Sequence, residues 1–209
     1  MIGIQPACLL QEFGEFLADQ MGLHFPQERW SDLERGLQFA SREFGFENTD
    51  KCIRWLLSAP LSREQVEILA AHLTVGETYF YRDKKTFEAF EGRILPELAR
   101  LRRGGGQCLR IWSAGCCSGE EPYSIAISIR KVLADIKDWQ VTVLGTDINP
   151  RFLRKAEEGV YSEWSFRDAS PGLREAYFEK TGNGQWEILP EIRSMVSFLH
   201  FNLASLDSP

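Results

Sequence analysis

The stretch from Cys108 to Pro150 constrains the fold of this chain more than any other part of the sequence. It begins with a short apolar run, CLRIWSA (108–114), and continues with a glycine-containing turn that leads into a helical pattern (115–136). A second apolar run, WQVTVLGTDIN (139–149), follows, and Pro150 opens a further helical pattern. Strands that alternate with helices in this way are typical of a parallel sheet with right-handed crossovers. The sequence therefore predicts an α/β fold.

A different pattern precedes this stretch, because the first part of the chain reads as one helix after another. Within 26–44, apolar side chains recur every three to four residues, which indicates one buried helical stripe. The stripe comprises Trp30, Leu33, Leu37, Phe39, Ala40 and Phe44. Ser62 and Gln65 have the spacing of a capping box at the start of a later helix. We therefore predict a small all-helical domain over residues 1–72, followed by a second domain over 73–209.

The second domain contains two further features. A helix is predicted over 84–103, where the glycine run 104–106 ends it. From about 160 to 197 the alternation of strand and helix breaks into turn signals with a short strand candidate, QWEIL, which predicts a small antiparallel β insertion. The segment MVSFLHFNL (195–203) then predicts a return to the main sheet as a third parallel strand.

The composition narrows the class of protein. A formal net charge of −6 and a pI near 5.2 argue against a nucleic-acid binder, which usually presents a basic face. The five cysteines and three histidines are scattered without metal-ligand spacing, so we expect free thiols and no metal site. No apolar run approaches the ~20 residues of a membrane span, and acidic residues interrupt the start too early for a signal peptide. We expect a cytoplasmic protein without membrane insertion.

The turn and the end of the second strand indicate a nucleotide-like ligand. Ligands of open α/β sheets bind beyond the carboxyl ends of the strands. Gly115 and Gly119 allow a close backbone approach there, and Asp147 ends the next strand, where a carboxylate can accept hydrogen bonds from both hydroxyls of a ribose. The alternative is a glycine turn that serves packing alone, with Asp147 as the cap of the helix that Pro150 opens.

The start of the following helix distinguishes between possible ligands. The turn matches neither GxGxxG nor a P-loop, and Glu120 with Glu121 would repel a pyrophosphate at a helix N-terminus. S-adenosylmethionine carries a sulfonium, an ammonium and a single carboxylate, so it fits this site better than NAD or ATP. Ser118 and Glu121 also have capping-box spacing, which leaves a simple helix cap as the alternative role for Glu121.

Four segments resemble motifs of the chemotaxis receptor glutamate methyltransferases, the CheR family. WSAGCCSGEEPYSIAI (112–127) resembles the cofactor loop, and LTVGETYFYRD (73–83) resembles the signature NxTxFFR. GTDINPRFLRKAEEGVY (145–161) is similar to the ribose-acid segment, and FNL (201–203) to the third-strand motif. The motifs follow the order and spacing of the family, and the helical start resembles its N-terminal domain more loosely. The resemblance implies a class I, Rossmann-like S-adenosylmethionine methyltransferase domain.

The motifs supply the candidate site residues. The cofactor-binding candidates are Thr78, Arg82, Gly115, Gly119, Glu121, Asp147, Asn202 and Leu203. Thr78 and Arg82 match the threonine and arginine of the second signature, and because they are four residues apart we expect them to share one helical face directed at the cofactor. The resemblance implies that Asp147 binds the ribose and that Asn202 and Leu203 lie on the adenine side. Arg82 is the catalytic candidate, and without the resemblance it would read as a surface salt-bridge residue. One departure is Gly76, where the family has an asparagine.

The resemblance also implies substrates and partners. The activity would be methylation of glutamate side chains on a methyl-accepting chemoreceptor-type protein, with S-adenosyl-L-homocysteine as the product. In the family a basic helical-domain surface meets receptor helices, and the insertion can dock a receptor C-terminal tail peptide. The matching helix here mixes Arg29, Arg35 and Arg42 with acidic residues, so it is less basic than expected. We expect no nucleic-acid partner.

The end of the sequence bears on activity. The family segment RNxxxYF has no counterpart, and the sheet stops after about its third strand, so we expect a truncated domain whose 209 residues lack turnover although the parent protein is active. Two rivals stay open: a methyltransferase for a different acceptor, and a non-catalytic scaffold that binds receptors through a partial S-adenosylmethionine fold.

Overall fold

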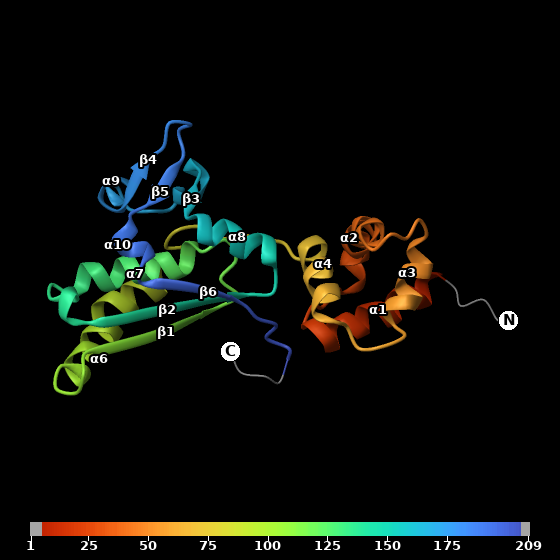
Figure 1. Cartoon of the computed structure of the whole chain (residues 1–209), viewed down its shortest axis with the longest axis horizontal. Coiled ribbons are helices and arrows are strands. Elements are labelled where there is room, and N and C mark those ends of the chain that lie inside the picture. Colours follow the sequence, from red (N-terminus) through yellow and green to blue (C-terminus); the bar gives the residue numbers. More distant parts are fainter. Residues whose placement is uncertain (1–5, 206–209) are drawn as a thin grey trace. The chain divides into compact units, whose positions relative to one another are not determined.

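The structure is a computed structural model that describes residues 6–205. The chain folds into two compact units (Figure 1). Among the described residues, the first, or helical, unit comprises 6–75, Ile148–Pro150 and 201–205. The second, or α/β, unit comprises Gly76–Asp147 and Arg151–His200. The domain boundaries that we placed at residues 72 and 73 from the sequence remain a prediction.

The helical unit contains four α-helices among the described residues. They are α1 (Pro6–Met21), α2 (Trp30–Glu43), α3 (Thr49–Leu56) and α4 (Arg63–Leu73), with a short 3-10 turn, η1 (Gln27–Arg29), before α2. Fully buried leucines and phenylalanines from these helices form one core, among them Phe13, Leu17, Leu33, Leu37 and Leu69. The helical start predicted from the sequence is confirmed.

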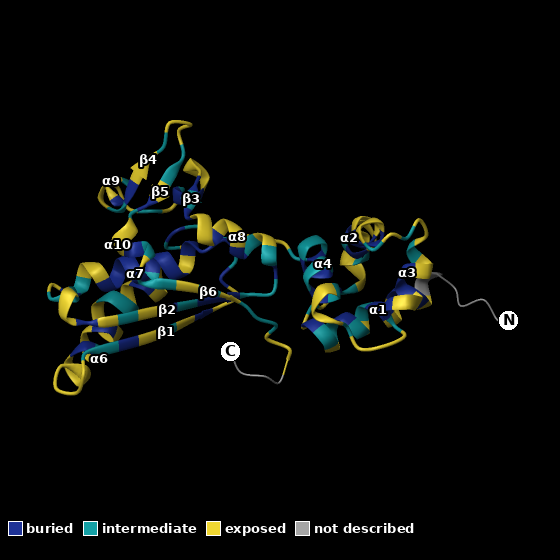
Figure 2. Cartoon of the chain, in the orientation of Figure 1, coloured by how far each residue is buried: buried dark blue, intermediate teal, exposed yellow. Residues whose placement is uncertain are grey.

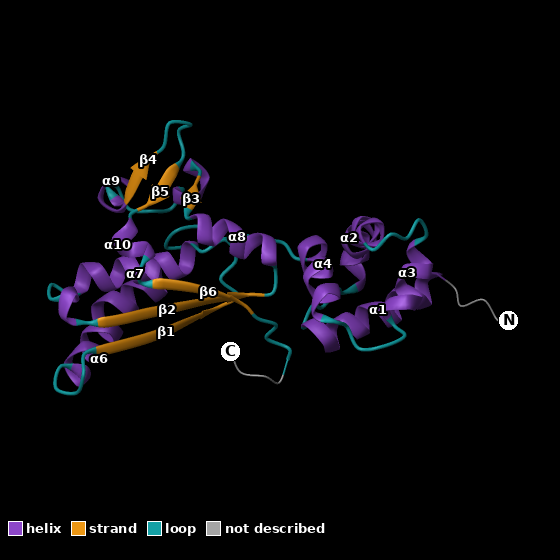
Figure 3. Ribbon diagram, in the orientation of Figure 1, coloured by secondary structure: helices purple, strands orange, loops and turns teal. Residues whose placement is uncertain are grey.

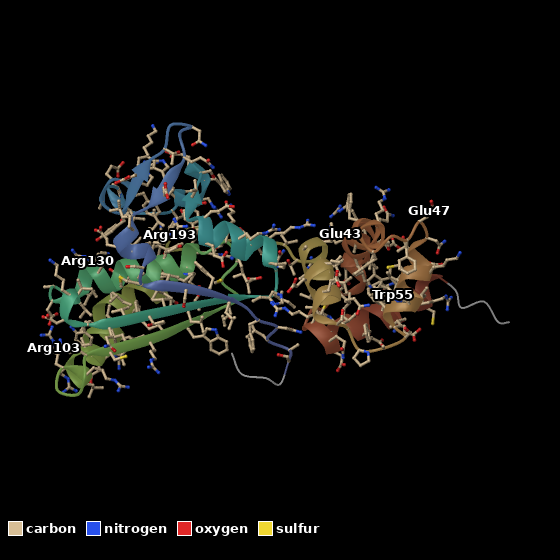
Figure 4. The ribbon with its side chains drawn as sticks, in the orientation of Figure 1. Glu43, Glu47, Trp55, Arg103, Arg130 and Arg193 are labelled. Carbon is tan, nitrogen blue, oxygen red and sulfur yellow. The ribbon has the colours of Figure 1, made fainter. Side chains whose placement is uncertain are left out.

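Two local predictions in this unit had opposite outcomes. The capping box of α4 is present, because the Ser62 hydroxyl accepts from the Gln65 amide while the Gln65 side chain accepts from the Ser62 amide. Phe39 was wrongly assigned to the buried stripe of α2, since it is 51% exposed and stacks on His72 at 6.2 Å between ring centroids. Figure 4 labels Glu43 on α2, whose carboxylate lies 2.6 Å from His72 Nε2.

The α/β unit is built on a parallel three-stranded sheet in the order β1-β2-β6. Its strands are β1 (Cys108–Ala114), β2 (Gln140–Asp147) and β6 (Val196–His200). Cys108 pairs with Gln140 at one end of the β1-β2 ladder, and Asp147 pairs with His200 at the end of the β2-β6 ladder. The parallel sheet and its third strand are therefore confirmed.

One face of this sheet is covered by α7 (Glu120–Val132), which contacts all three strands. Buried and exposed residues alternate along the strands, as Figure 2 shows. Leu109 and Val143 are buried, whereas Trp112 and Leu199 on the opposite parity are 48% and 44% exposed. The alternation is the period of two that strands impose on side chains.

The helix predicted over 84–103 forms with a change of geometry in its middle. It consists of α5 (Lys84–Ala89), a π-helical turn, η2 (Phe90–Ile94), and α6 (Leu95–Arg102). The Leu95 amide donates to the Phe90 carbonyl five residues back, and Pro96 has no amide hydrogen to continue the α-helical ladder. Arg103, labelled in Figure 4, ends this segment and pairs with Asp135 at 3.1 Å.

A small antiparallel sheet, in the order β3-β5-β4, forms the insertion (Figure 3). The helix α8 (Pro150–Glu158) leads into the insertion, and the short 3-10 turn η3 (Ile136–Asp138) precedes β2. The insertion itself contains β3 (Val160–Tyr161), η4 (Glu163–Phe166), α9 (Leu173–Tyr177), β4 (Phe178–Lys180), β5 (Trp186–Ile188) and α10 (Pro190–Arg193). Phe80 packs against Tyr161, Phe166 and Phe178, with ring centroids 4.9, 4.9 and 5.0 Å apart. The predicted antiparallel insertion is confirmed. No helix among the described residues is long and apolar enough to cross a membrane.

Candidate active site

The turn after β1 adopts a backbone shape that depends on left-handed residues. Gly115 has φ 73° and Gly119 has φ 92°, and the amides of Gly115 and Cys116 both donate to the Thr146 carbonyl at 2.8 Å. The Cys117 amide donates to Asp147 Oδ2 at 2.8 Å. The Asp147 carboxylate at the end of β2 therefore holds the glycine turn directly. The two lie close together because β1 and β2 are adjacent parallel strands whose carboxyl ends meet at the same edge of the sheet.

The two glycines differ in what surrounds them. A Cβ built on Gly119 would lie 2.8 Å from Ala156 Cβ and 3.0 Å from the Tyr161 hydroxyl, so a side chain does not fit there. A Cβ on Gly115 would meet no atom within 4 Å, and Gly115 lines an open pocket. Gly119 thus serves packing against α8, whereas Gly115 leaves room for a ligand.

The segment that precedes α5 is not helical, which corrects our placement of Thr78 and Arg82 on one helical face. The Phe80 amide donates to the Ser165 carbonyl at 2.9 Å, and the Tyr81 amide donates to Ser124 Oγ at 3.1 Å. Tyr81 has φ 58°. These partners lie far along the chain, and they replace the carbonyls four residues back that a helix would use. The prediction of a helix from the four-residue spacing of Thr78 and Arg82 was therefore wrong.

Thr78 and Arg82 nevertheless line the same pocket, which has a volume of about 540 Å³. Its wall is formed by Glu77–Tyr79 and Arg82–Lys85 together with Phe87, by Gly115–Cys117 and Glu121, and by Asp168. This volume is within the range of small-molecule sites. The pocket combines three basic side chains with four acidic ones, so it suits a ligand that carries both signs of charge.

The sequence candidates are distributed unevenly around this pocket. Thr78, Arg82, Gly115 and Glu121 are among its lining residues. Asp147 contacts the turn through Cys117, and Gly119 packs behind the turn. Their roles toward a cofactor stay predictions.

The third-strand pair lies in the helical unit. Asn202 Nδ2 donates to the Gln20 carbonyl at 2.8 Å, and Leu203 is exposed. A contact of Asn202 and Leu203 with adenine stays a prediction.

The beginning of α7 holds two glutamates in different surroundings. Ser113 Oγ donates to Glu121 Oε1 at 2.6 Å, which fixes a carboxylate at the edge of the pocket. Glu120 is only 1% exposed and accepts from Ser118 Oγ and Ser165 Oγ at 2.8 and 3.0 Å. The predicted capping box is wrong, because Gly119 is the N-cap and the Ser118 hydroxyl turns to Glu120.

Glu120 was missed as a site residue. It joins the turn, through Ser118, to the insertion, through Ser165. Ser165 also accepts the amide of Phe80, so one buried carboxylate connects three segments around the pocket. Two adjacent glutamates at a helix start give no sequence signal that separates the buried one from the pocket one.

The cysteines of the turn are poor nucleophiles. Burial raises the pKa of the Cys116 thiol, and the nearby Asp147 carboxylate raises it further. Burial also raises the pKa of Cys117, which lines the pocket. The thiolate is the reactive form of cysteine, so both side chains are neutral and inert near pH 7.

The structure explains the departure at Gly76. A Cβ on Gly76 would lie 2.5 Å from Phe152 Cζ and 2.6 Å from Cys117 Sγ. The Phe152 ring and the Cys117 thiol thus occupy the space into which the family's asparagine would extend. Position 76 is therefore a glycine because Phe152 and Cys117 leave no room for a side chain there.

Three aromatic and basic residues beside the pocket were also missed. The Arg167 guanidinium carbon lies 3.7 Å from the centroid of the Tyr79 ring and 4.5 Å from that of Trp164. Tyr79 is a lining residue, next to Thr78. The sequence signal available was WSFRD (164–168), in which a tryptophan and an arginine stand three residues apart at the start of the insertion.

The residues present fit S-adenosylmethionine. The Glu121 carboxylate suits the ammonium group, the basic side chains of the pocket suit the carboxylate, and the open space at Gly115 allows a close approach to the turn. A parallel sheet with a glycine turn after its first strand and an acid ending the next is the arrangement of domains that bind a nucleotide-like cofactor. The mixed charges of the pocket favour the class of S-adenosylmethionine-binding methyltransferase domains.

Comparison with known proteins identifies the family. The family profile described as "CheR methyltransferase, SAM binding domain" matches residues 76–209. The chain is 40% identical over 147 residues to chemotaxis protein methyltransferase 1 of Pseudomonas aeruginosa, covering 68% of this chain and 52% of that protein. It is 32% identical over 151 residues to a probable chemotaxis protein methyltransferase of Rhizobium etli, covering 71% and 56%. The chain belongs to the CheR methyltransferase family.

A third relative extends the similarity over the helical unit. The chain is 30% identical over 203 residues to chemotaxis protein methyltransferase Cher2 of Pseudomonas putida, which covers 95% of this chain and 72% of that protein. The chain thus spans about half the length of the first two relatives and more of the third. Its cofactor is S-adenosylmethionine, as the matched family domain indicates.

Proposed function

We propose that the protein containing this chain methylates glutamate side chains of a methyl-accepting chemoreceptor-type protein in the cytoplasm. The pocket carries this proposal, because it places the Glu121 carboxylate, the open turn at Gly115 and the Arg82 guanidinium around one cavity. Relatives named chemotaxis protein methyltransferases support the chemotaxis context. The acceptor would be presented by receptor helices, with a receptor tail peptide as a second contact.

Each side chain of the site would perform a separate task. Glu121, which accepts a hydrogen bond from Ser113, would bind the cofactor's ammonium group, and Thr78, another lining residue, would also contact the cofactor. Asp147 would accept hydrogen bonds from the ribose while it holds the turn through Cys117. Asn202 and Leu203 would border the adenine.

The reaction needs no general base. A glutamate has a reference pKa of ~4.3, so the acceptor carboxylate is ionised near pH 7. When bound, the cofactor supplies an electrophilic methyl group on a positive sulfur. Transfer forms a C–O bond to the carboxylate and breaks the C–S bond, whose electron pair remains on sulfur, leaving a neutral ester and neutral S-adenosylhomocysteine. The protein contributes alignment and exclusion of water, with reacting atoms ~3–3.5 Å apart.

Arg82 would orient the incoming carboxylate or the cofactor carboxylate at the pocket mouth. The test uses the full-length protein, radiolabelled S-adenosylmethionine and receptor-containing membranes of the source organism. Glutamate methyl esters release labelled methanol in mild alkali, whereas methyl groups on nitrogen do not. We expect alkali-labile label on the receptor, and a large loss of it with Arg82→Ala. Alkali-stable label, or label on another acceptor, would refute the proposed substrate.

A further inference from the structure

An arginine of the insertion, Arg167, stacks on two aromatic rings beside the pocket. Its guanidinium carbon lies 3.7 Å from the centroid of the Tyr79 ring and 4.5 Å from that of the Trp164 ring. Arg167 Nη1 donates to the Trp164 carbonyl at 2.9 Å. Stacking on aromatic faces leaves the edge of a guanidinium available for hydrogen bonds in the ring plane, which is the geometry that recognises carboxylates.

A second arginine, Arg82, contacts the same tyrosine ring. The guanidinium carbon of Arg82 lies 5.9 Å from the Tyr79 centroid, and Arg82 Nη1 donates to the Glu77 carbonyl. Its Nη2 lies 3.6 Å from Glu77 Oε2, while Arg167 Nη2 lies 3.9 Å from Glu77 Oε1. One carboxylate therefore stands between two guanidiniums that come from separate segments of the chain.

The Glu77 carboxylate is only loosely held. Both separations exceed the 2.7–2.9 Å typical of a charge-assisted hydrogen bond. The Glu77 side chain is 68% exposed, and exposed ion pairs add little stability. An external carboxylate that reaches the two arginines thus displaces Glu77 at small cost. Glu77, Tyr79 and Arg82 line the pocket that Gly115 and Glu121 also line, so this carboxylate would lie at the cofactor.

We propose that Arg82 and Arg167 form the binding site for the acceptor's side-chain carboxylate and that Glu77 occupies this site when no acceptor is bound. The proposal rests on the proposed function and adds to it a second arginine and an internal competitor. One carboxylate oxygen would pair with the arginines while the other faces the methyl group. The ester product is neutral and attracts guanidiniums less than a carboxylate does, so Glu77 would return and favour product release.

The test observes the arginine side chains directly. Nε–Hε NMR resonances of Arg82 and Arg167 are followed in the full-length protein during titration with N-acetylglutamate N-methylamide, with and without S-adenosylhomocysteine. The neutral analogue N-acetylglutamine N-methylamide has the same shape without the charge. We expect the carboxylate compound alone to shift both resonances.

Three variants locate the site. Glu77→Gln removes the competitor and should tighten binding of the carboxylate compound by about 1.5- to 5-fold, the range expected for an exposed ion pair. Arg167→Lys keeps the positive charge but removes the planar guanidinium that stacks on the rings and can bind a carboxylate with two hydrogen bonds, so it should weaken binding of the carboxylate compound. Arg174→Lys is the matched control, because Arg174 also lies in the insertion and over a ring, 5.2 Å from Trp186, yet pairs with Glu163. It should leave the binding unchanged.

The outcomes separate this inference from the proposed function. Equal shifts with both compounds, or no gain in Glu77→Gln, would overturn the two-arginine site. If Arg174→Lys weakened binding of the carboxylate compound as much as Arg167→Lys does, the two-arginine site would be overturned as well, because any change in the insertion would then affect binding. Calorimetry of S-adenosylhomocysteine with the same samples tests the methyltransferase proposal independently, and the arginine resonances are read whether or not that compound binds.

Discussion

A single methyl group at Gly119 tests whether the turn after β1 has the packing described above. Gly119→Ala places a Cβ 2.8 Å from Ala156 Cβ and 3.1 Å from Ala156 Cα, at a residue with φ 92°. A left-handed conformation costs a non-glycine residue about 1–2 kcal/mol, and overpacking costs about 1–3 kcal/mol. We therefore predict a loss of about 2–5 kcal/mol in the free energy of unfolding, measured by urea titration.

Two other glycines provide the comparison. Gly115→Ala has the φ strain without the clash, so it should cost about 1–2 kcal/mol in stability and, in addition, reduce affinity for S-adenosylhomocysteine because its Cβ enters the pocket. A Cβ at Gly105 meets no atom of the described residues within 4 Å, and the backbone of Gly105 is not in the left-handed region, so Gly105→Ala should be nearly neutral. Equal stability losses for Gly119→Ala and Gly105→Ala would refute the packing argument.

Three further predictions concern the core and its titrating groups. Phe80→Ala should lower the free energy of unfolding by about 3–5 kcal/mol in urea titration, because the ring is fully buried among three aromatic rings; a loss below about 1 kcal/mol would contradict this. Iodoacetamide at pH 8, read by mass spectrometry, should alkylate exposed Cys8 well before Cys116, whose pKa burial raises; the reverse order would be inconsistent with that environment. Burial raises the pKa of Tyr123 to about 12, so the unfolded chain loses this proton near pH 10 while the folded chain keeps it. The contribution of Tyr123 to the free energy of unfolding is therefore complete below pH 10 and falls between pH 10 and 12. Tyr123→Phe should flatten this decline in urea titrations across that pH range, and an unchanged dependence on pH would exclude Tyr123 as its source.

The sheet could be predicted closely from the sequence because its signals are local. The apolar run 108–114 coincides with β1, and the run 139–149 contains β2. The break in rhythm after residue 160 correctly predicted the insertion, since glycine-rich turns and a short apolar run are sufficient to indicate a hairpin. These features depend on residues within a few positions of one another.

The pocket wall could not be predicted in the same way because its contacts are distant in sequence. The segment around Phe80 gives its amide hydrogens to Ser165 and Ser124, so tertiary partners override the helical spacing of Thr78 and Arg82. Arg167 belongs to none of the four family motifs, and its contacts with Tyr79 and Glu77, both distant in sequence, bring it to the pocket. The exclusion of a side chain at Gly76 likewise follows from Phe152 and Cys117, which the sequence alone does not bring together.

We propose that the pocket lined by Thr78, Gly115 and Glu121 binds the cofactor. Calorimetric titration of S-adenosylhomocysteine into the full-length protein and its Glu121→Gln variant decides whether the ligand binds there. Loss of a charged hydrogen bond to the ligand's ammonium group should weaken binding by about tenfold or more, with the fold unchanged by circular dichroism. Equal affinity of the two proteins would contradict the placement of the cofactor in this pocket.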